Sequence, residues 1–270
     1  MTTGTDAIIG TDGVDIISAT AATLTPLDSV DGADGMDTLS YTETTGAGVV
    51  AGDLSPAGAS IVNVEKLSVA SAAGVALNAA DMGTFSDLTV AASAAGAVSA
   101  ASTSSLKSAS ITTTGTAAIT GASTTLESVK LTGTGVSAVS STALTSATLK
   151  NTTGVLTNTA AAGTREVAVS LNNSAGYADA TATTLNVSAT GAASTAATIA
   201  GAAATAINIS GDVALTVGTF ADGTAATVTN TSTAAVTITP ALDNDTTYVG
   251  SDASDSIMLG ANTKATMTLV

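Results

Sequence analysis

Apolar and polar residues follow one short pattern that recurs five times between residues 64 and 149. In each copy an apolar residue and two variable residues precede an apolar, polar, apolar triplet, which indicates a short strand with one buried face. The copies begin at Val64, Phe85, Leu106, Leu126 and Leu144, so they are 21, 21, 20 and 18 residues apart. A fixed period near 20 predicts a solenoid, whose stacked units share one continuous core.

The same alternation continues to about residue 238, and a second series of apolar residues runs between its strands. The first series is Leu67, Leu88, Ala109, Val129, Ala147, Val167, Leu185, Ile207 and Val228. The second is Val75, Leu77, Val98, Ile119, Val139, Leu156, Ile199, Leu215 and Val236. A coil of about 20 residues has a contour of roughly 66 Å, enough for two strands and two corners. The pattern predicts an all-β fold, a parallel β-solenoid with Leu67, Leu88, Val129 and Leu185 in one inward column.

The amino-acid composition distinguishes a β-solenoid from another repeat fold of the same period. Leucine-rich repeats share the period, but their helical side needs helix-forming residues, and here Ala, Gly, Ser and Thr fill that side. Aromatic residues make up 2% of the chain, so small aliphatic side chains must fill a narrow interior. We expect one continuous elongated body in three parts: N-terminal coils over residues 1–45, solenoid repeats over 46–240 and a C-terminal segment over 241–270.

Several function classes are disfavoured by residue usage. The chain has no cysteine and no histidine, which removes disulfides, thiolate and imidazole metal sites, and the commonest general base, so we expect no enzyme activity. Six basic and 21 acidic residues give a net charge of -15, which argues against nucleic acid as a partner. No run of about 18 apolar residues occurs, so membrane insertion is not expected.

The acidic residues are concentrated towards the two ends of the chain. Seven of the 21 lie in the first 37 residues, whereas the stretch between Leu88 and Arg165 contains a single acid, Glu127. Residues 10–18 and 32–40 both follow the calcium-binding nonapeptide pattern, with its second glycine replaced. The candidate calcium ligands in these two segments are Gly10, Asp12, Gly13, Asp15, Gly32, Asp34, Gly35 and Asp37.

The order of residues in this pattern suits a calcium site. Glycines permit tight turns with positive φ and expose carbonyl oxygens, while aspartates add charged oxygens. Three pairs of equivalent residues are each 22 residues apart: Asp12 and Asp34, Asp15 and Asp37, and Ile17 and Leu39. Because this spacing is about one coil, we expect the two turns to stack with Ca²⁺ between them. The alternative is that they are ordinary Asp-Gly turns of a β protein.

A degenerate third copy occupies residues 250–258 and keeps Asp252 and Asp255 but loses the internal glycine. These two aspartates are candidate calcium ligands. The alternative, that they belong to an ordinary turn of a β protein, applies here as well. The segment 265–270 is interpreted either as a final β-strand or as the apolar ending of a secretion signal. Residues 1–6 lack the basic and apolar regions of a Sec signal peptide.

The N-terminal nonapeptides, the block 27–39 and the segment 61–67 resemble RTX-type surface-layer proteins of Gram-negative bacteria, as do residues 206–212 and 256–260. Such proteins are exported by type I secretion and assemble into a calcium-dependent two-dimensional lattice on the cell. The resemblance implies those properties here. The middle of the chain resembles the family mainly by composition and period, and the family's usual tandem nonapeptides are absent.

We therefore expect an extracellular, non-catalytic, calcium-binding solenoid that assembles with copies of itself in a surface layer. A cell-surface polysaccharide is a further candidate partner. An RTX adhesin stalk and the noncatalytic roll of a secreted protease or lipase remain as alternatives. A Thr-x-Thr face at Thr227, Thr229 and Thr231, of the kind that ice-binding solenoids present, is not favoured because it recurs irregularly.

Overall fold

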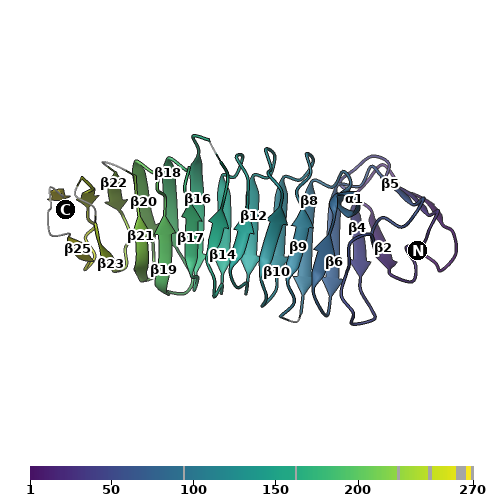
Figure 1. The fold of residues 1–270 in the computed structure, drawn as a ribbon, viewed down its shortest axis with the longest axis horizontal. Helices are drawn as coiled ribbons and strands as arrows, with labels where there is room; N and C mark the ends of the chain where they lie inside the picture. Colours follow the sequence, from purple (N-terminus) through teal and green to yellow (C-terminus); the bar gives the residue numbers. More distant parts are fainter. Residues whose placement is uncertain (94, 162, 224–225, 243–244, 260–265, 269–270) are drawn as a thin grey trace. The chain divides into compact units, whose positions relative to one another are not determined.

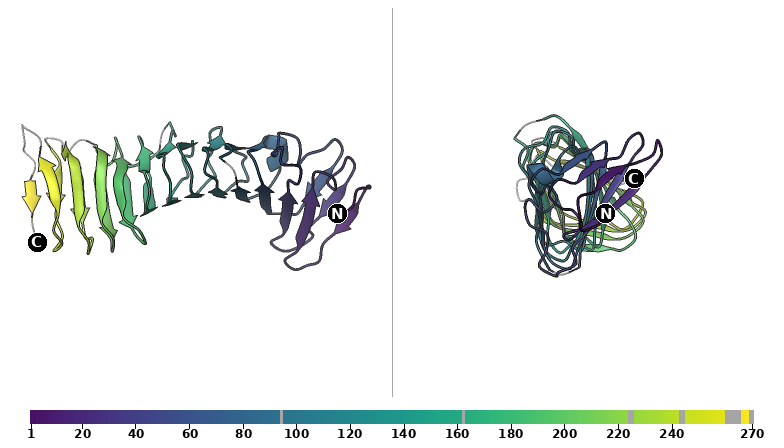
Figure 2. Two further views of the ribbon diagram at one scale, coloured as in Figure 1. Left: turned by 90° about the horizontal axis from the view of Figure 1, so that it is seen from below. Right: turned by 90° about the vertical axis from the view of Figure 1, so that its right-hand side faces the viewer.

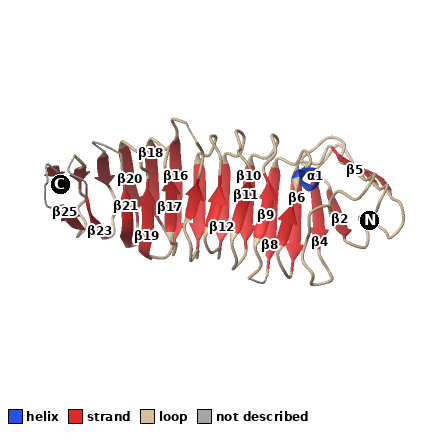
Figure 3. Cartoon of the chain, in the orientation of Figure 1, coloured by secondary structure: helices blue, strands red, loops and turns tan. Residues whose placement is uncertain are grey.

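A computed structural model describes residues 1–93, 95–161, 163–223, 226–242, 245–259 and 266–268 (Figure 1). By its contacts the chain divides into two compact units, Met1–Val129 (unit 1) and Lys130–Val270 (unit 2). Both units are built from parallel strands that wind as a β-solenoid, with about 21 residues per turn. The predicted fold class is confirmed. The only helix in the described ranges is α1 (Ala79–Met82), which rules out a leucine-rich repeat (Figure 3).

Unit 1 contains strands of three parallel sheets. The first comprises β2 (Ile16–Thr20), β4 (Thr38–Thr42), β6 (Lys66–Ser71), β8 (Asp87–Ala92), β10 (Ser108–Thr112) and β12 (Ser128–Thr132), which spans the unit boundary. The second comprises β7 (Val75–Leu77), β9 (Val98–Ala101) and β11 (Ala117–Thr120). The first coils add a small third sheet of β1 (Ala7–Ile9), β3 (Ser29–Asp31) and β5 (Ser60–Val62), which the periodicity did not predict.

Unit 2 has two sets of parallel strands, and each set follows chain order (Figure 2). One set comprises β14 (Ser146–Lys150), β16 (Glu166–Asn172), β18 (Thr184–Ala189), β20 (Ala206–Gly211), β22 (Thr227–Asn230), β24 (Thr247–Val249) and β26 (Thr266–Thr268). The other comprises β13 (Ser137–Val139), β15 (Leu156–Asn158), β17 (Gly176–Asp179), β19 (Ser194–Ala200), β21 (Leu215–Ala221), β23 (Val236–Leu242) and β25 (Ser256–Leu259). β26 covers part of the predicted terminal strand, and residues 265, 269 and 270 lie outside the described ranges. No helix in the part of the chain described here has the length and hydropathy of a membrane span.

The strand register confirms one predicted column and corrects another. In unit 1 Leu67, Leu88 and Ala109 are successive Cα partners, as the periodicity predicted. In unit 2 the predicted partner of Ala147 is wrong, because Ala147 pairs with Val169 rather than with Val167. Residues two apart on a strand face the same side, so apolar alternation cannot distinguish registers that differ by two residues.

The observed register of the second apolar series differs from the predicted one at several positions. Val98 pairs with Ala117, two residues before the predicted Ile119. The series also missed a coil, since Tyr177 on β17 pairs with Leu156 on one side and with Ile199 on the other. The sequence Gly-Tyr-Ala-Asp carries a single large apolar side chain, and its first and last residues gave no strand signal.

The core is a narrow stack of aliphatic side chains, as the composition predicted. Leu67, Leu88, Val129 and Leu185 are all buried. Leu185 pairs with Val167, which places it in a different column from Ala147. Strands alternate between buried and exposed positions, as in the pattern of β6.

Candidate metal site

The two predicted nonapeptide turns stack on each other in unit 1. Ile17 and Leu39 are Cα partners in β2 and β4, which confirms the 22-residue register. The Asp15 N–H donates to Oδ1 of Asp37 at 2.8 Å, and the Thr38 N–H donates to the Asp15 carbonyl at 2.9 Å. A side-chain carboxylate of one coil therefore holds the backbone of the coil before it.

Gly10 and Gly32 are needed because the stacked backbones approach closely. A Cβ at Gly10 would lie 2.3 Å from the Gly32 carbonyl oxygen and 2.8 Å from Oδ2 of Asp15. A Cβ at Gly32 would lie 1.9 Å from the Asn63 carbonyl oxygen and 2.5 Å from Oδ2 of Asp37. Each glycine thus leaves a cradle between a carboxylate and a carbonyl, both of which are oxygen donors of the kind that calcium prefers.

The two turns differ in the hydrogen bonds that their aspartate carboxylates accept. In the first turn the Thr11 N–H and hydroxyl donate to Oδ2 of Asp15 at 2.6 and 3.0 Å. The equivalent of Thr11 in the second turn is Ala33, which has a φ of 66° and donates its N–H to Asp31 instead. Asp37 therefore receives no hydrogen bond equivalent to those that Thr11 makes to Asp15.

Asp37 consequently carries a buried carboxylate oxygen without a hydrogen bond. The residue is 0% exposed, and its Oδ2 has no hydrogen-bond partner among the described residues. The Asp37 N–H donates to Glu65 at 2.9 Å, so the column of carboxylates continues from Asp15 through Asp37 to Glu65. A buried charged oxygen without a partner is costly, and a bound cation would remove that cost.

The remaining predicted ligands of these turns lie elsewhere. Asp12 and Asp34 are exposed on the outer side of the turns. Gly13 has open space around its Cα, and Gly35 has a φ of 131° and packs against the Gly13 carbonyl. Across the described ranges, no three acidic side chains are grouped so as to hold a metal ion. A cation here would need two carboxylates supplemented by backbone carbonyls.

Sequence reasoning missed a related turn directly before the first nonapeptide. The Thr2 N–H donates to Oδ2 of Asp6 at 2.6 Å and its hydroxyl donates to Oδ1 at 2.9 Å, which repeats the contacts of Thr11 with Asp15. The segment matches the nonapeptide only in part, because Met1 and Thr3 stand where the pattern has glycine and aspartate. The signal was the five-residue pattern Thr-x-Gly-x-Asp, which begins at residue 2 and again at residue 11.

Asp28 repeats the stacking of Asp37 at the other corner of the same coil. Its Oδ1 accepts from the Asp6 N–H at 2.7 Å, and its Oδ2 accepts from the Thr25 N–H at 2.5 Å. The bonds from the backbone of Asp6 and Thr25 lower the pKa of the Asp28 carboxyl below its ordinary value. A hydrogen bond from the Asn63 amide lowers the pKa of Asp31 in the same way.

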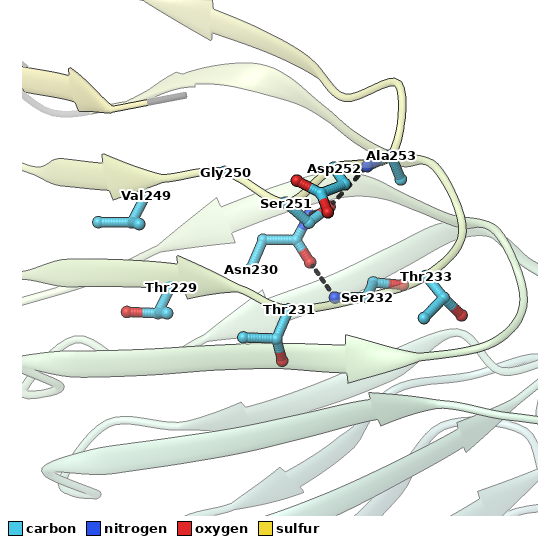
Figure 4. Close-up of a pocket in the computed structure, with 10 residues that line it drawn as sticks. All are labelled: Thr229, Asn230, Thr231, Ser232, Thr233, Val249, Gly250, Ser251, Asp252 and Ala253. Atoms are coloured by element: carbon cyan, nitrogen blue, oxygen red, sulfur yellow. Dashed lines mark hydrogen bonds between the residues drawn. The ribbon is translucent and has the colours of Figure 1, made fainter. Parts of the chain in front are cut away.

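The degenerate copy in unit 2 borders a groove of about 500 Å³, which residues 229–233 and 249–253 line (Figure 4). Oδ2 of Asp255 accepts from the Asn230 amide at 2.8 Å and from the Tyr248 hydroxyl at 3.1 Å, and its Oδ1 accepts from the Val236 N–H at 3.1 Å. Asp252 is exposed at the edge of the groove. Asp255 is thus engaged by protein donors, whereas the Asp252 side chain is exposed.

Unit 2 also buries a charged network that sequence reasoning missed. Nη2 of Arg165 lies 2.6 and 2.7 Å from the two carboxylate oxygens of Asp179, and both side chains are almost fully buried. Oδ2 of Asp179 also accepts from the Asn158 amide and the Tyr177 hydroxyl, each at 2.9 Å. Burial works to raise the pKa of Asp179, but the hydrogen bonds from Arg165, Thr181 and Tyr177 outweigh it and hold the pKa below its ordinary value.

Tyr41 is the largest side chain of unit 1 with a buried hydroxyl that lacks a partner among the described residues. Burial raises the pKa of Tyr41 to about 12, with further contributions from the charges of Asp53, Glu43 and Asp81. Of these, Asp81 is held by the Gly52 and Leu54 N–H groups, at 2.8 and 3.1 Å.

Comparison of the chain with models of known protein families finds no match, and comparison with curated proteins finds none either.

Proposed function

We propose that this protein is a non-catalytic structural module of an extracellular surface layer, which binds calcium in its N-terminal coils and assembles with copies of itself. The proposal includes the RTX-type resemblance, export by type I secretion and a position on the cell surface. A cell-surface polysaccharide is the proposed anchoring partner. A solenoid is compatible with such a role because it presents long regular faces and open strand edges at which copies can associate.

The observation that carries the calcium proposal is the buried, unpartnered Oδ2 of Asp37. Asp37 would hold the ion together with the Asn63 carbonyl, which faces the same cradle at Gly32. Asp15 and the Gly32 carbonyl form the equivalent cradle at Gly10. Bound calcium would neutralise the stacked carboxylates. The protein itself already positions the carboxylates, because Asp37 and Glu65 each accept a hydrogen bond from a backbone N–H of the coil before.

A calcium titration with two matched variants tests the metal site. Asp37→Asn removes the buried charge and should abolish the rise in melting temperature that calcium causes. Asp34→Asn removes an exposed charge three residues away in the same turn and should leave that rise unchanged. Calcium at about 100 times its dissociation constant stabilises a folded state by about 2.7 kcal/mol per site. Equal calcium responses in the wild type and Asp37→Asn would contradict the site.

Electron microscopy with and without calcium tests the structural role. A surface-layer module should form regular sheets in millimolar calcium. An adhesin stalk should form isolated fibres, and the roll of a secreted hydrolase should stay monomeric. A strictly monomeric protein at high concentration would contradict the assembly proposal, whatever the result of the calcium titration.

A further inference from the structure

Exposed apolar side chains gather at one end of unit 1. Among the described residues, seven of the nine exposed large hydrophobic side chains lie between residues 9 and 62, and only Val136 and Met258 lie in unit 2. Ile9, Val14 and Ile16 are 80%, 72% and 71% exposed. Ile9 directly precedes the first nonapeptide, and Val14 and Ile16 belong to it. We call these three residues, together with Asp12, the N-terminal patch.

The N-terminal patch lies beside open strand edges. Among the described residues, β1 and β2 are each the last strand of their sheet, so no described strand pairs with their outer backbone groups. Residues 1–45 carry eight acidic residues and no basic residue. Apolar side chains beside an open edge favour association with another surface. The negative charge requires that this surface be neutral or positive.

One surface in unit 2 has the complementary character. Val136 is 69% exposed in the loop that follows β12. This loop stacks directly on the loop that follows β14, because the Gly133 N–H donates to the Lys150 carbonyl at 2.9 Å and a Cβ at Gly154 would lie 2.1 Å from the Val136 nitrogen. Lys130 and Lys150 are exposed on β12 and β14. We call Lys130, Val136 and Lys150 the lysine patch.

Charge argues against Met258, the other exposed large apolar residue described in unit 2, as the surface that the N-terminal patch contacts. Met258 follows Asp252 and Asp255 closely in the chain, so an acidic end would be repelled there. The lysine patch lies in a stretch where Glu127 is the only acid between Leu88 and Arg165. Complementary charges beside an apolar centre steer two surfaces together and fix their register.

We propose that the N-terminal patch of one copy docks on the lysine patch of a second copy. This inference rests on the proposed assembly and names the surfaces that would mediate it. The two patches differ, so the contact is heterologous. Unless the rotation between copies closes a ring, every assembly keeps one free patch of each kind at its two ends, and growth continues into an open array.

Mixing two defective variants tests this contact. The first variant, Lys130→Glu with Lys150→Glu, keeps the N-terminal patch but should not accept a neighbour. The second, Ile9→Ser with Ile16→Ser, keeps the lysine patch but should not dock. Sedimentation velocity in millimolar calcium should show each variant monomeric alone and a dimer in the equimolar mixture. The dimer cannot grow, because its two remaining patches are both defective.

Lys107→Glu is the matched control for the charge reversal, since Lys107 is exposed but lies in unit 1, before the first residue of β10. It should assemble like the wild type, whereas the lysine-patch variant should need at least about tenfold more protein to assemble. Unchanged melting temperatures would show that the variants fold. Assembly of the lysine-patch variant at the wild-type concentration would overturn the docking contact and leave the proposed function intact. A wild type that does not assemble would instead remove the proposed function.

Discussion

Nη2 of Arg165 bridges both carboxylate oxygens of Asp179 inside unit 2, at 2.6 and 2.7 Å. Arg165 precedes β16 and Asp179 ends β17, so the pair ties two consecutive coils together at one corner. The Thr183 N–H also donates to the Arg165 carbonyl at 3.0 Å, which holds the backbone on the same side of the corner. In a core of aliphatic side chains, this polar contact fixes how the two coils meet.

Removing one partner of this pair should be strongly destabilising. Asp179→Ala leaves the buried guanidinium without its counter-charge, which typically costs about 3 to 5 kcal/mol of unfolding free energy. Urea denaturation followed by circular dichroism measures the loss. Asp252→Ala removes an exposed carboxylate from the same unit and should change the free energy of unfolding by less than about 0.5 kcal/mol. Equal effects of the two substitutions would contradict the structural importance of the ion pair.

The same carboxyl predicts a pH dependence of stability. The pKa of Asp179 is lowered in the folded state, so its stabilisation is complete above the ordinary aspartate pKa near 4. It is lost as the pH falls from there through the lowered folded pKa. Asp28 and Asp31 have lowered pKa values as well and act in the same direction. Melting temperatures should therefore be level from about pH 5 to 7 and should fall steeply below about pH 4. A flat profile down to pH 2 would be inconsistent with these contacts.

Two buried tyrosines should respond oppositely to loss of their hydroxyl. Tyr177 donates to Oδ2 of Asp179 at 2.9 Å, so Tyr177→Phe should cost about 1.5 to 3 kcal/mol, the range for hydrogen bonds to charged groups. The Tyr41 hydroxyl is buried without a partner, so Tyr41→Phe should be neutral or stabilising by about 1 kcal/mol. Thermal unfolding of both variants beside the wild type makes the comparison. A large destabilisation by Tyr41→Phe would reveal a bond that the described contacts lack.

The sequence predicted the strands well because burial on one face imposes a two-residue alternation. It predicted the register less well, since Val167 and Val169 face the same way and either could have paired with Ala147. The Arg165–Asp179 pair lay beyond the pattern because the two residues are 14 apart and belong to no repeated triplet. In the nonapeptides the spacing of Asp15 and Asp37 was right. The expectation that glycines serve positive φ holds only at Gly35 among the four motif glycines.

The motif glycines that lack a positive φ allow a test of why Gly32 is needed. Gly13 and Gly32 belong to the same predicted motif, and neither has a positive φ, so alanine fits the backbone conformation at both. A Cβ at Gly13 would meet only the Thr11 hydroxyl at 3.6 Å, whereas a Cβ at Gly32 would lie 1.9 Å from the Asn63 carbonyl oxygen. Gly13→Ala should therefore leave the melting temperature within a few degrees of the wild type.

Gly32→Ala should separate the second coil from the third and break the bond between the Gly32 N–H and the Val62 carbonyl, which is 3.0 Å long. The cost should exceed the 1 to 3 kcal/mol that is roughly typical of overpacking, because the clash is with backbone that cannot move aside without parting the strands. The destabilisation should affect residues 1–62 first, since those coils lie on the N-terminal side of the disrupted contact. Hydrogen exchange measured by mass spectrometry would show it as faster exchange in β1 to β5, with β8 and β10 protected as in the wild type. Uniform loss of protection throughout unit 1 would mean that the N-terminal coils do not open separately from the rest.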